Sequence, residues 1–279
     1  MFVAGAVTGL ARTAAAATMY GTTGSGGNNF FAFIEIDLST GQTNQIGDEL
    51  NYWTCLDMSP DGQTLYAADE DLFTIDAASG SATDIGTLTF QGTAVTAEAL
   101  SISPAGEIFV VTDSGQDPSG KARLYTVDPN SAAMTLKGDL DDTILINAIE
   151  FAADGTLYGA YGTLHVLDPS SGATLQTIGD LGDPFLIGLD IDENGRMVGL
   201  NDFFESLYTI DPAGTPGALA THLVDVQDEL HAIASGPDRG FQVPEPDAIL
   251  LLVIAFLIVL CQRLLFPTVK GAVATISTK

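Results

Sequence analysis

Short apolar runs alternate with turn residues along most of the chain, and one seven-residue pattern recurs five times. Its first copy is Leu56–Gly62, which reads Leu-Asp-Met-Ser-Pro-Asp-Gly. The other copies begin at Leu100, Ile149, Leu189 and Ile233, at steps of 44, 49, 40 and 44 residues. A small residue precedes each copy. A repeat of this length indicates one supersecondary unit that is copied along the chain.

A second pattern also occurs five times and ends in an aspartate that opens a turn. Its copies are Phe33–Asp37, Leu72–Asp76, Leu124–Asp128, Leu164–Asp168 and Leu207–Asp211. The aspartate is followed by Pro, Ser, Thr or Gly within a few residues, as in Asp-Pro-Ser-Ser-Gly from Asp168. This composition is typical of type I turns.

Together the two patterns predict four short strands in each unit. In the second unit we expect strands at residues 54–59, 64–68, 72–76 and 82–86. Asp-Gly or Asn-Gly at Gly62, Gly155 and Gly195 marks the hairpin between the first two strands. Four strands every ~45 residues is the spacing of β-propeller blades.

The first and last units are incomplete in a complementary way. The first lacks an innermost strand, and the last supplies only one, at residues 231–234. We therefore expect an all-β, five-bladed propeller over residues 18–240, in which the C-terminal strand closes the N-terminal blade and leaves no open edge. The pattern resembles the broad YVTN, NHL and quinoprotein-like propeller families, a resemblance that implies the fold and little about function.

The chain is strongly acidic, with 36 Asp and Glu against 9 Lys and Arg and a formal net charge of −27. Such a surface repels phosphate backbones, so nucleic acid is excluded as a partner. Every acidic residue lies at or before Asp247, whereas Arg263, Lys270 and Lys279 follow a hydrophobic run. This asymmetry is a membrane-orientation signal.

Residues 1–17 have the apolar stretch and Ala-x-Ala end of a secretory signal, although the only early charge is Arg12. The alternative is an Ala-rich terminus without that role. Residues 248–266 form an apolar run near the ~20 residues of a membrane span. We expect a hydrophobic or transmembrane helix there and a basic cytoplasmic tail at 267–279, with a buried core helix as the alternative.

A linker at residues 241–247 precedes this run and contains Val243, Pro244, Glu245 and Pro246. This motif, the apolar helix and the basic Arg263 together resemble the PEP-CTERM sorting signal. The resemblance covers about the last 37 residues and implies processing by an exosortase-like enzyme and export to the cell surface. The reduced arginine cluster and the tail through Lys279 depart from that pattern.

The predicted innermost strands surround a channel, and their entry residues are candidates for a ligand site. These residues are Thr54, Glu98, Asn147, Ile187 and His231. Glu98, Asn147 and His231 could bind a metal such as Ca²⁺ or a polar ligand, much as calcium-dependent lactonase-like propellers arrange carboxylates and amides. Thr54 and Ile187 do not fit a full ligand set, and a hydrated polar channel is the alternative.

Four further features have plain structural explanations. Asp57, Glu150 and Asp190 form a second ring that we expect to bond backbone amides between blades, with side chains that face the channel as the alternative. The run from Asp190 to Gly195 matches the start of a calcium loop but has Asn201 where the loop needs Glu, so we expect a turn. Cys55 falls in a predicted buried strand. His165 replaces the aromatic residue of the other blades, and we expect it to pack in the core as an aromatic side chain does.

The loops that enter the innermost strands are acidic and include Asp142, with Tyr52 and Trp53 alongside. An exposed Trp53 among carboxylates could hold a sugar or a cation. With no nucleophile elbow or phosphate loop in the sequence, we expect an exported binding or scaffold propeller at the cell surface or in the extracellular matrix, with polysaccharide among its partners. The alternative is a secreted lactonase-, lyase- or quinoprotein-like enzyme with a site in the channel.

Overall fold

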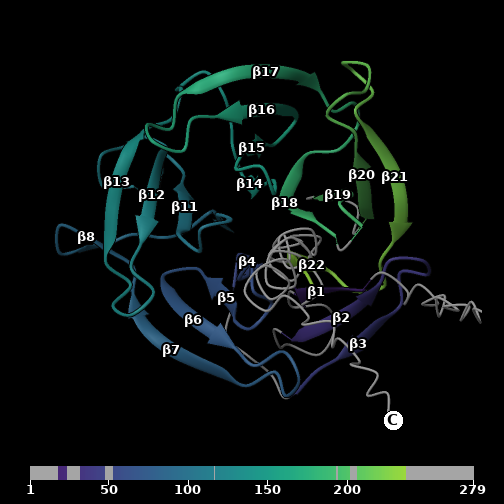
Figure 1. Ribbon diagram of the computed structural model, residues 1–279, viewed down its shortest axis with the longest axis horizontal. Helices are drawn as coiled ribbons and strands as arrows, with labels where there is room; N and C mark the ends of the chain where they lie inside the picture. The colour runs from purple at the N-terminus through teal and green to yellow at the C-terminus, as the bar shows by residue number, and fades with distance from the viewer. Residues whose placement is uncertain are drawn as a thin grey trace, which may run out of the picture. The chain divides into compact units, whose positions relative to one another are not determined.

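Five four-stranded antiparallel sheets follow one another around a central channel (Figure 1). The computed structural model describes residues 18–23, 32–47, 53–115, 117–192, 194–201 and 206–236. These residues form strands and turns, and no helix occurs among them. The fold is an all-β, five-bladed propeller, as the repeat predicts.

The blades follow the chain in order, each from its innermost to its outermost strand. One blade contains β4 (Cys55–Met58), β5 (Leu65–Ala68), β6 (Asp71–Ile75) and β7 (Ala82–Thr87). The next contains β10 (Ala99–Ile102), β11 (Ile108–Thr112), β12 (Arg123–Val127) and β13 (Met134–Asp139). The third contains β14 (Ala148–Phe151), β15 (Leu157–Ala160), β16 (Thr163–Leu167) and β17 (Thr174–Asp180). The fourth contains β18 (Leu186–Ile191), β19 (Met197–Asn201), β20 (Ser206–Ile210) and β21 (Ala220–Asp225).

The fifth blade joins the two ends of the propeller. It consists of β22 (Leu230–Ser235), β1 (Thr18–Thr23), β2 (Phe33–Asp37) and β3 (Thr43–Gln45), in that order. β22 pairs antiparallel with β1, with Met19 opposite Ser235 and Gly21 opposite Ile233. The predicted closure of the N-terminal blade by the C-terminal strand is confirmed.

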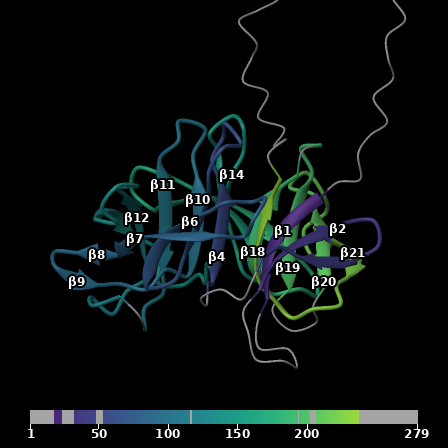
Figure 2. The same ribbon diagram turned by 90° about the horizontal axis from the view of Figure 1, so that it is seen from below.

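Burial falls from the channel to the rim of each blade. All four residues of β4, β10 and β14 are buried, whereas the outer strands β7, β17 and β21 alternate between half-buried and exposed residues. The inner strands contact one another in the order β4, β10, β14, β18, β22 and back to β4, and they lie at the centre of the side view in Figure 2. Buried apolar side chains form five clusters, each between two neighbouring blades. Each blade therefore completes the core of its neighbours.

Local turn chemistry fixes the strand connections. In the predicted hairpin after β4, the Gly62 amide donates to the Ser59 carbonyl at 2.8 Å, and Gly62 has a φ of 68°. The turn-opening aspartates behave as predicted, because the Oδ1 of Asp168 accepts the Ser170 amide at 2.8 Å and that of Asp37 accepts the Ser39 amide at 2.7 Å. An unpredicted two-stranded hairpin, β8 (Thr89–Phe90) and β9 (Thr93–Ala94), lies between the first two blades.

The predicted segments at both ends lie outside the described residues. These are residues 1–17, the motif at 243–246, the apolar run at 248–266 and the tail at 267–279. Within the described ranges, no helix combines the length and hydrophobicity of a membrane span.

The contact between the last two blades can be tested at Gly41, in the turn before β3. A Cβ at this position would lie 1.9 Å from the Asp225 carbonyl oxygen of the neighbouring blade, and Gly41 has a φ of 69°. Gly41→Ala should lower the free energy of unfolding by about 2–4 kcal/mol, since it adds a clash to the backbone strain. Denaturant titration measures this loss.

Gly106→Ala is the matched control, because Gly106 has a φ of 84° and a Cβ there would meet nothing within 4 Å. It should cost only about 1–2 kcal/mol, the strain of a left-handed conformation. Equal losses in the two variants would contradict a close contact between blades at Gly41.

Candidate functional site

The five residues that enter the inner strands stand around one end of the channel, here called the mouth. Thr54, Glu98, Asn147, Ile187 and His231 are all half-buried. The amides of Thr54, Glu98 and Asn147 still pair with carbonyls of the second strand of their blade, at 2.8–3.1 Å. The mouth residues are thus held by the β-ladder and not by flexible loops.

The structure brings two of the three predicted ligand residues into contact. The Nδ2 atom of Asn147 donates to Oε1 of Glu98 at 3.4 Å, which links neighbouring blades. The Nε2 atom of His231 lies 4.0 Å from Oε1 of Glu229, on its own blade. Thr54 donates from Oγ1 to the Ala97 carbonyl at 2.9 Å. The polar part of the mouth is therefore centred on Glu98 and Asn147.

Asp69 is a mouth residue that the sequence analysis missed. It lies in the turn between β5 and β6, beside Thr54, and is half-buried. Burial, and then the charge of Glu70, raise the pKa of its carboxyl. Burial also raises the pKa of the Cys55 thiol, and the charges of Asp69 and Glu98 add to that rise, so both carboxylates lie near this buried cysteine. Asp69 follows β5, the second strand of its blade. The recurring seven-residue pattern marks only the innermost strand of each blade, so it gives no signal for Asp69.

Below the mouth, apolar side chains and small residues narrow the channel. Its walls include Leu56, Leu100, Ile149, Leu189 and Ile233. The free volume among them is about 10 Å³, roughly that of one water molecule. A ligand that enters the mouth is stopped at this level.

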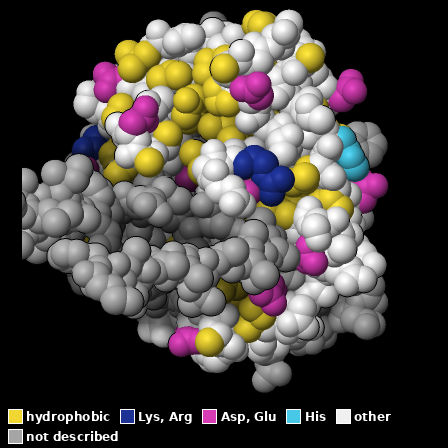
Figure 3. Space-filling model, turned by 45° about the vertical axis from the view of Figure 1, so that its right-hand side comes forward, with side chains coloured by type: hydrophobic (Ala, Val, Ile, Leu, Met, Phe, Trp, Pro, Cys, Tyr) yellow, Lys and Arg dark blue, Asp and Glu magenta, His cyan; other side chains and the backbone are white. Residues whose placement is uncertain are grey.

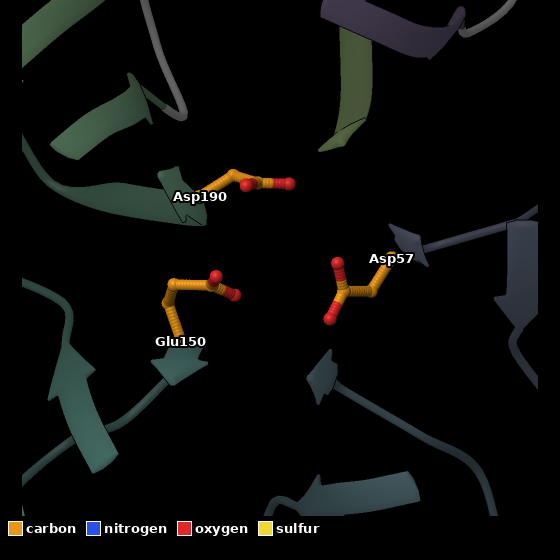
Figure 4. Close-up of side chains that lie close together, drawn as sticks. All are labelled: Asp57, Glu150 and Asp190. Carbon is orange, nitrogen blue, oxygen red and sulfur yellow. The ribbon is translucent and has the colours of Figure 1, made fainter. Parts of the chain in front are cut away.

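Three carboxylates converge at the other end of the inner strands (Figure 4). Asp57 of β4, Glu150 of β14 and Asp190 of β18 each offer an oxygen, and these oxygens lie within 4.8 Å of one another. Each of the three residues is only 1% exposed. We call this set the carboxylate triad.

Hydrogen bonds across the blade boundaries confirm the structural role expected for this ring. Oδ2 of Asp57 accepts the Ile102 amide at 2.6 Å, and Oδ2 of Asp190 accepts the Ser235 amide at 2.7 Å. Ser101 occupies the equivalent position between them and accepts the Phe151 amide at 3.0 Å. Its hydroxyl donates to Oε2 of Glu150 at 3.0 Å.

Burial makes the charged form of the triad costly. It raises the pKa of Asp190 to about 7, against the lowering effect of the Ser235 amide. Burial, and then the charge of Asp190, raise the pKa of Glu150 well above its usual value. Protons are therefore held within the triad at pH values where exposed carboxyls are ionised.

The expected turn after Asp190 is confirmed. Oδ1 of Asp192 accepts the amides of Asn194 and Arg196, both at 2.9 Å. Oδ2 of Asp192 pairs with the Arg196 guanidinium at 2.8 Å. Arg196 is thus paired with the Asp192 carboxylate, which would bind the ion in a calcium loop.

The expected exposure of Trp53 is wrong. Its side chain is 1% exposed and packs against Phe73, with ring centroids 5.5 Å apart. It fills the core between the fifth blade and the β4 blade, so Trp53 offers no exposed ring to a ligand. Asp142 is exposed as predicted, whereas Tyr52 lies outside the described residues.

The described surface carries few cations, and Figure 3 shows Lys and Arg side chains in small separate groups on one face. Lys121 and Arg123 both pair with Asp139, at 2.7 and 2.9 Å.

Two other predictions are confirmed, because Cys55 and His165 are both buried. His165 lies in β16 and bonds Thr177 through Nδ1 at 3.1 Å.

Comparison with solved structures supports the fold. The chain is similar to a gluconolactonase from Xanthomonas campestris (16% identity, TM-score 0.49), with 80% of this chain and 84% of that one covered. A protein assigned as a gluconolactonase in a structural genomics study matches at 13% identity and a TM-score of 0.50, over 77% and 80% of the two chains. A protein from a study of the de novo emergence of a symmetrical protein matches at 19% identity and a TM-score of 0.51, over 79% and 98%.

No protein-family model matches the chain, and no curated protein does so either. At these identities the structural likeness establishes the propeller fold alone. The expectation of a cell-surface scaffold is corrected, because a fold neighbour with a TM-score of 0.50 is assigned as an enzyme, a gluconolactonase.

The triad predicts an unusual pH dependence of stability. Folding raises the pKa of Asp190 from 3.8 to about 7, so the folded state binds more protons than the unfolded state between these values. The free energy of unfolding should therefore fall as pH rises from about 4 to about 7, by a total on the order of 4 kcal/mol from this group, with about half of that fall above pH 5.5. Thermal unfolding between pH 5.5 and 8.5 measures the trend.

Glu150→Gln is the informative variant, because it removes one of the three carboxyls and nearly preserves the volume. It should flatten the decline and raise the melting temperature at pH 8.5. Burial lowers the pKa of His165, which has the opposite effect on the pH trend and is unchanged in the variant. A wild type whose stability rises steadily from pH 5.5 to 8.5 would contradict a protonated triad.

Proposed function

We propose that this propeller is a lactone hydrolase whose reaction takes place at the mouth of the channel. The observation that carries the proposal is the contact between Glu98 and Asn147, at 3.4 Å, above a channel too narrow for a substrate. Rigid strands hold both groups at a half-buried depth, where a small ligand has access. The gluconolactonases among the fold neighbours support this reaction class.

The carboxylate of Glu98 is the general base in this proposal. It takes a proton from a water molecule, whose oxygen attacks the lactone carbonyl carbon. The ring C–O bond then breaks, and the leaving ring oxygen takes the proton from Glu98 to become a hydroxyl group, so the product is a hydroxy acid and Glu98 is ionised again. The Asn147 amide orients Glu98 through its hydrogen bond, which fixes the carboxylate relative to the bound substrate.

The donor set at the mouth fits a hard cation such as Ca²⁺. Glu98, Asn147 and Asp69 offer carboxylate and amide oxygens, the ligand types that calcium prefers. Ile187 on the fourth blade contributes no donor, so a cation would be held from one side of the mouth. When bound, such an ion would polarise a substrate carbonyl.

The proposal is tested by acid release from lactones in the presence of Ca²⁺ or a chelator. Glu98→Gln should lower kcat/KM by about 10²–10⁴-fold, since the amide cannot accept the proton. Glu107→Gln is the control, because Glu107 is exposed in the hairpin at the opposite end of the inner strand. Full activity of Glu98→Gln, or no turnover of any lactone by the wild type, would overturn the proposal.

We further propose that the enzyme is exported and sorted through its C-terminal region. The sequence motif from Val243 to Pro246, the apolar run that follows it and the basic Arg263 support this. An exosortase-like enzyme is the implied partner, and an uncut tail would anchor the chain in a membrane.

The intact mass of the mature protein from its native host tests the export proposal. Loss of residues 1–17 and of everything after the Val-Pro-Glu-Pro motif is the expected result. A full-length mass in the cytosolic fraction would contradict both export and sorting.

A further inference from the structure

Two exposed apolar side chains stand at equivalent positions on the rim of the mouth. Leu145 lies two residues before Asn147, and Phe185 lies two residues before Ile187. Leu145 is 68% exposed and Phe185 is 44% exposed, although both are large hydrophobic residues. They belong to neighbouring blades, because β14 and β18 are in contact.

Among the rim positions that the structure describes, only those of Leu145 and Phe185 are apolar. The same position carries Thr96 in the β10 blade and Glu229 in the β22 blade, and its fifth occupant, Tyr52, is outside the described residues. The mouth residue next to Phe185 is the aliphatic Ile187, which also lines the channel. An apolar side, formed by Leu145, Phe185 and Ile187, therefore adjoins the polar pair of Glu98 and Asn147.

Phe185 is supported in its exposed position. Its ring lies 5.0 Å from that of Tyr161, in the turn between β15 and β16, measured between centroids. The amide of Leu186 donates to the Tyr161 carbonyl at 2.7 Å, which ties the two loops together. An apolar surface that is held open in this way is typical of a ligand-contact site.

We infer that the substrate is a lactone with an apolar tail, whose ring binds at Glu98 and whose tail lies against Leu145, Phe185 and Ile187. This inference rests on the proposed lactone hydrolysis. A polyhydroxylated sugar lactone would place hydroxyl groups against this apolar side and leave them without partners. A membrane surface is a poorer occupant, because two exposed side chains bury little area and the net charge of −27 opposes anionic lipids.

The test is a series of δ-lactones that carry unbranched alkyl tails of one, five and nine carbons, compared with glucono-δ-lactone. Each buried methylene should raise kcat/KM about fourfold, until the tail extends past the rim. The double variant Leu145→Ser with Phe185→Ser should lose most of this dependence on tail length. Leu175→Ser is the matched control, because Leu175 is 64% exposed on the outer strand β17 and should leave the dependence unchanged.

Equilibrium binding of the corresponding alkyl δ-lactams separates the two proposals, since the lactams share ring and tail but resist hydrolysis. Binding that strengthens with tail length, without turnover of any lactone, would support the apolar side and overturn the proposed reaction. Turnover without a dependence on tail length, or a preference for glucono-δ-lactone, would overturn the inference alone. Absence of both binding and turnover would overturn both.

Discussion

The pairing of β22 with β1 is the constraint on which the rest of the molecule depends. Each cluster of buried side chains lies between two blades, so a blade has a complete core only when it has a neighbour on both sides. An open chain of five blades would expose two apolar faces and two strand edges. Closure by residues 230–235 removes both liabilities at once and fixes the inner strands around the channel. The mouth and the carboxylate triad exist only in this closed arrangement.

The same inner strands carry polar residues with opposite roles at the two ends of the channel. At the mouth, Glu98 and Asn147 are half-buried and are joined by a hydrogen bond across two blades. Three residues further along the inner strands, Asp57 and Asp190 bond backbone amides of neighbouring blades and are shielded from solvent. The difference follows from solvent exposure. A carboxyl group that is buried away from water must either accept hydrogen bonds from nearby protein groups or stay protonated.

The sequence predicts the fold well and the site poorly, for physical reasons. Strand positions can be read from the repeat because its apolar residues mark strands and its turn residues mark the hairpins between them. The ends of the strands in the β4 blade therefore lie within one or two residues of the predicted ends. Side-chain surroundings depend on which blades meet. Trp53 stands beside an acidic loop in the sequence but fills the core beside Phe73. Asp69 reaches the mouth from a turn outside the recurring pattern. The apolar rim likewise becomes visible only when Leu145 and Phe185 are seen on adjacent blades.

The register of the closing strand also governs how the propeller responds to a pulling force. Met19 lies opposite Ser235, so the first residues of β1 and the last residues of β22 lie at the same end of this antiparallel pair. Tension between the termini would load the hydrogen bonds of this pair one after another, as a zipper opens, and not all together in shear. The ring that gains cooperative thermal stability from closure is thus mechanically weakest at the seam that closes it.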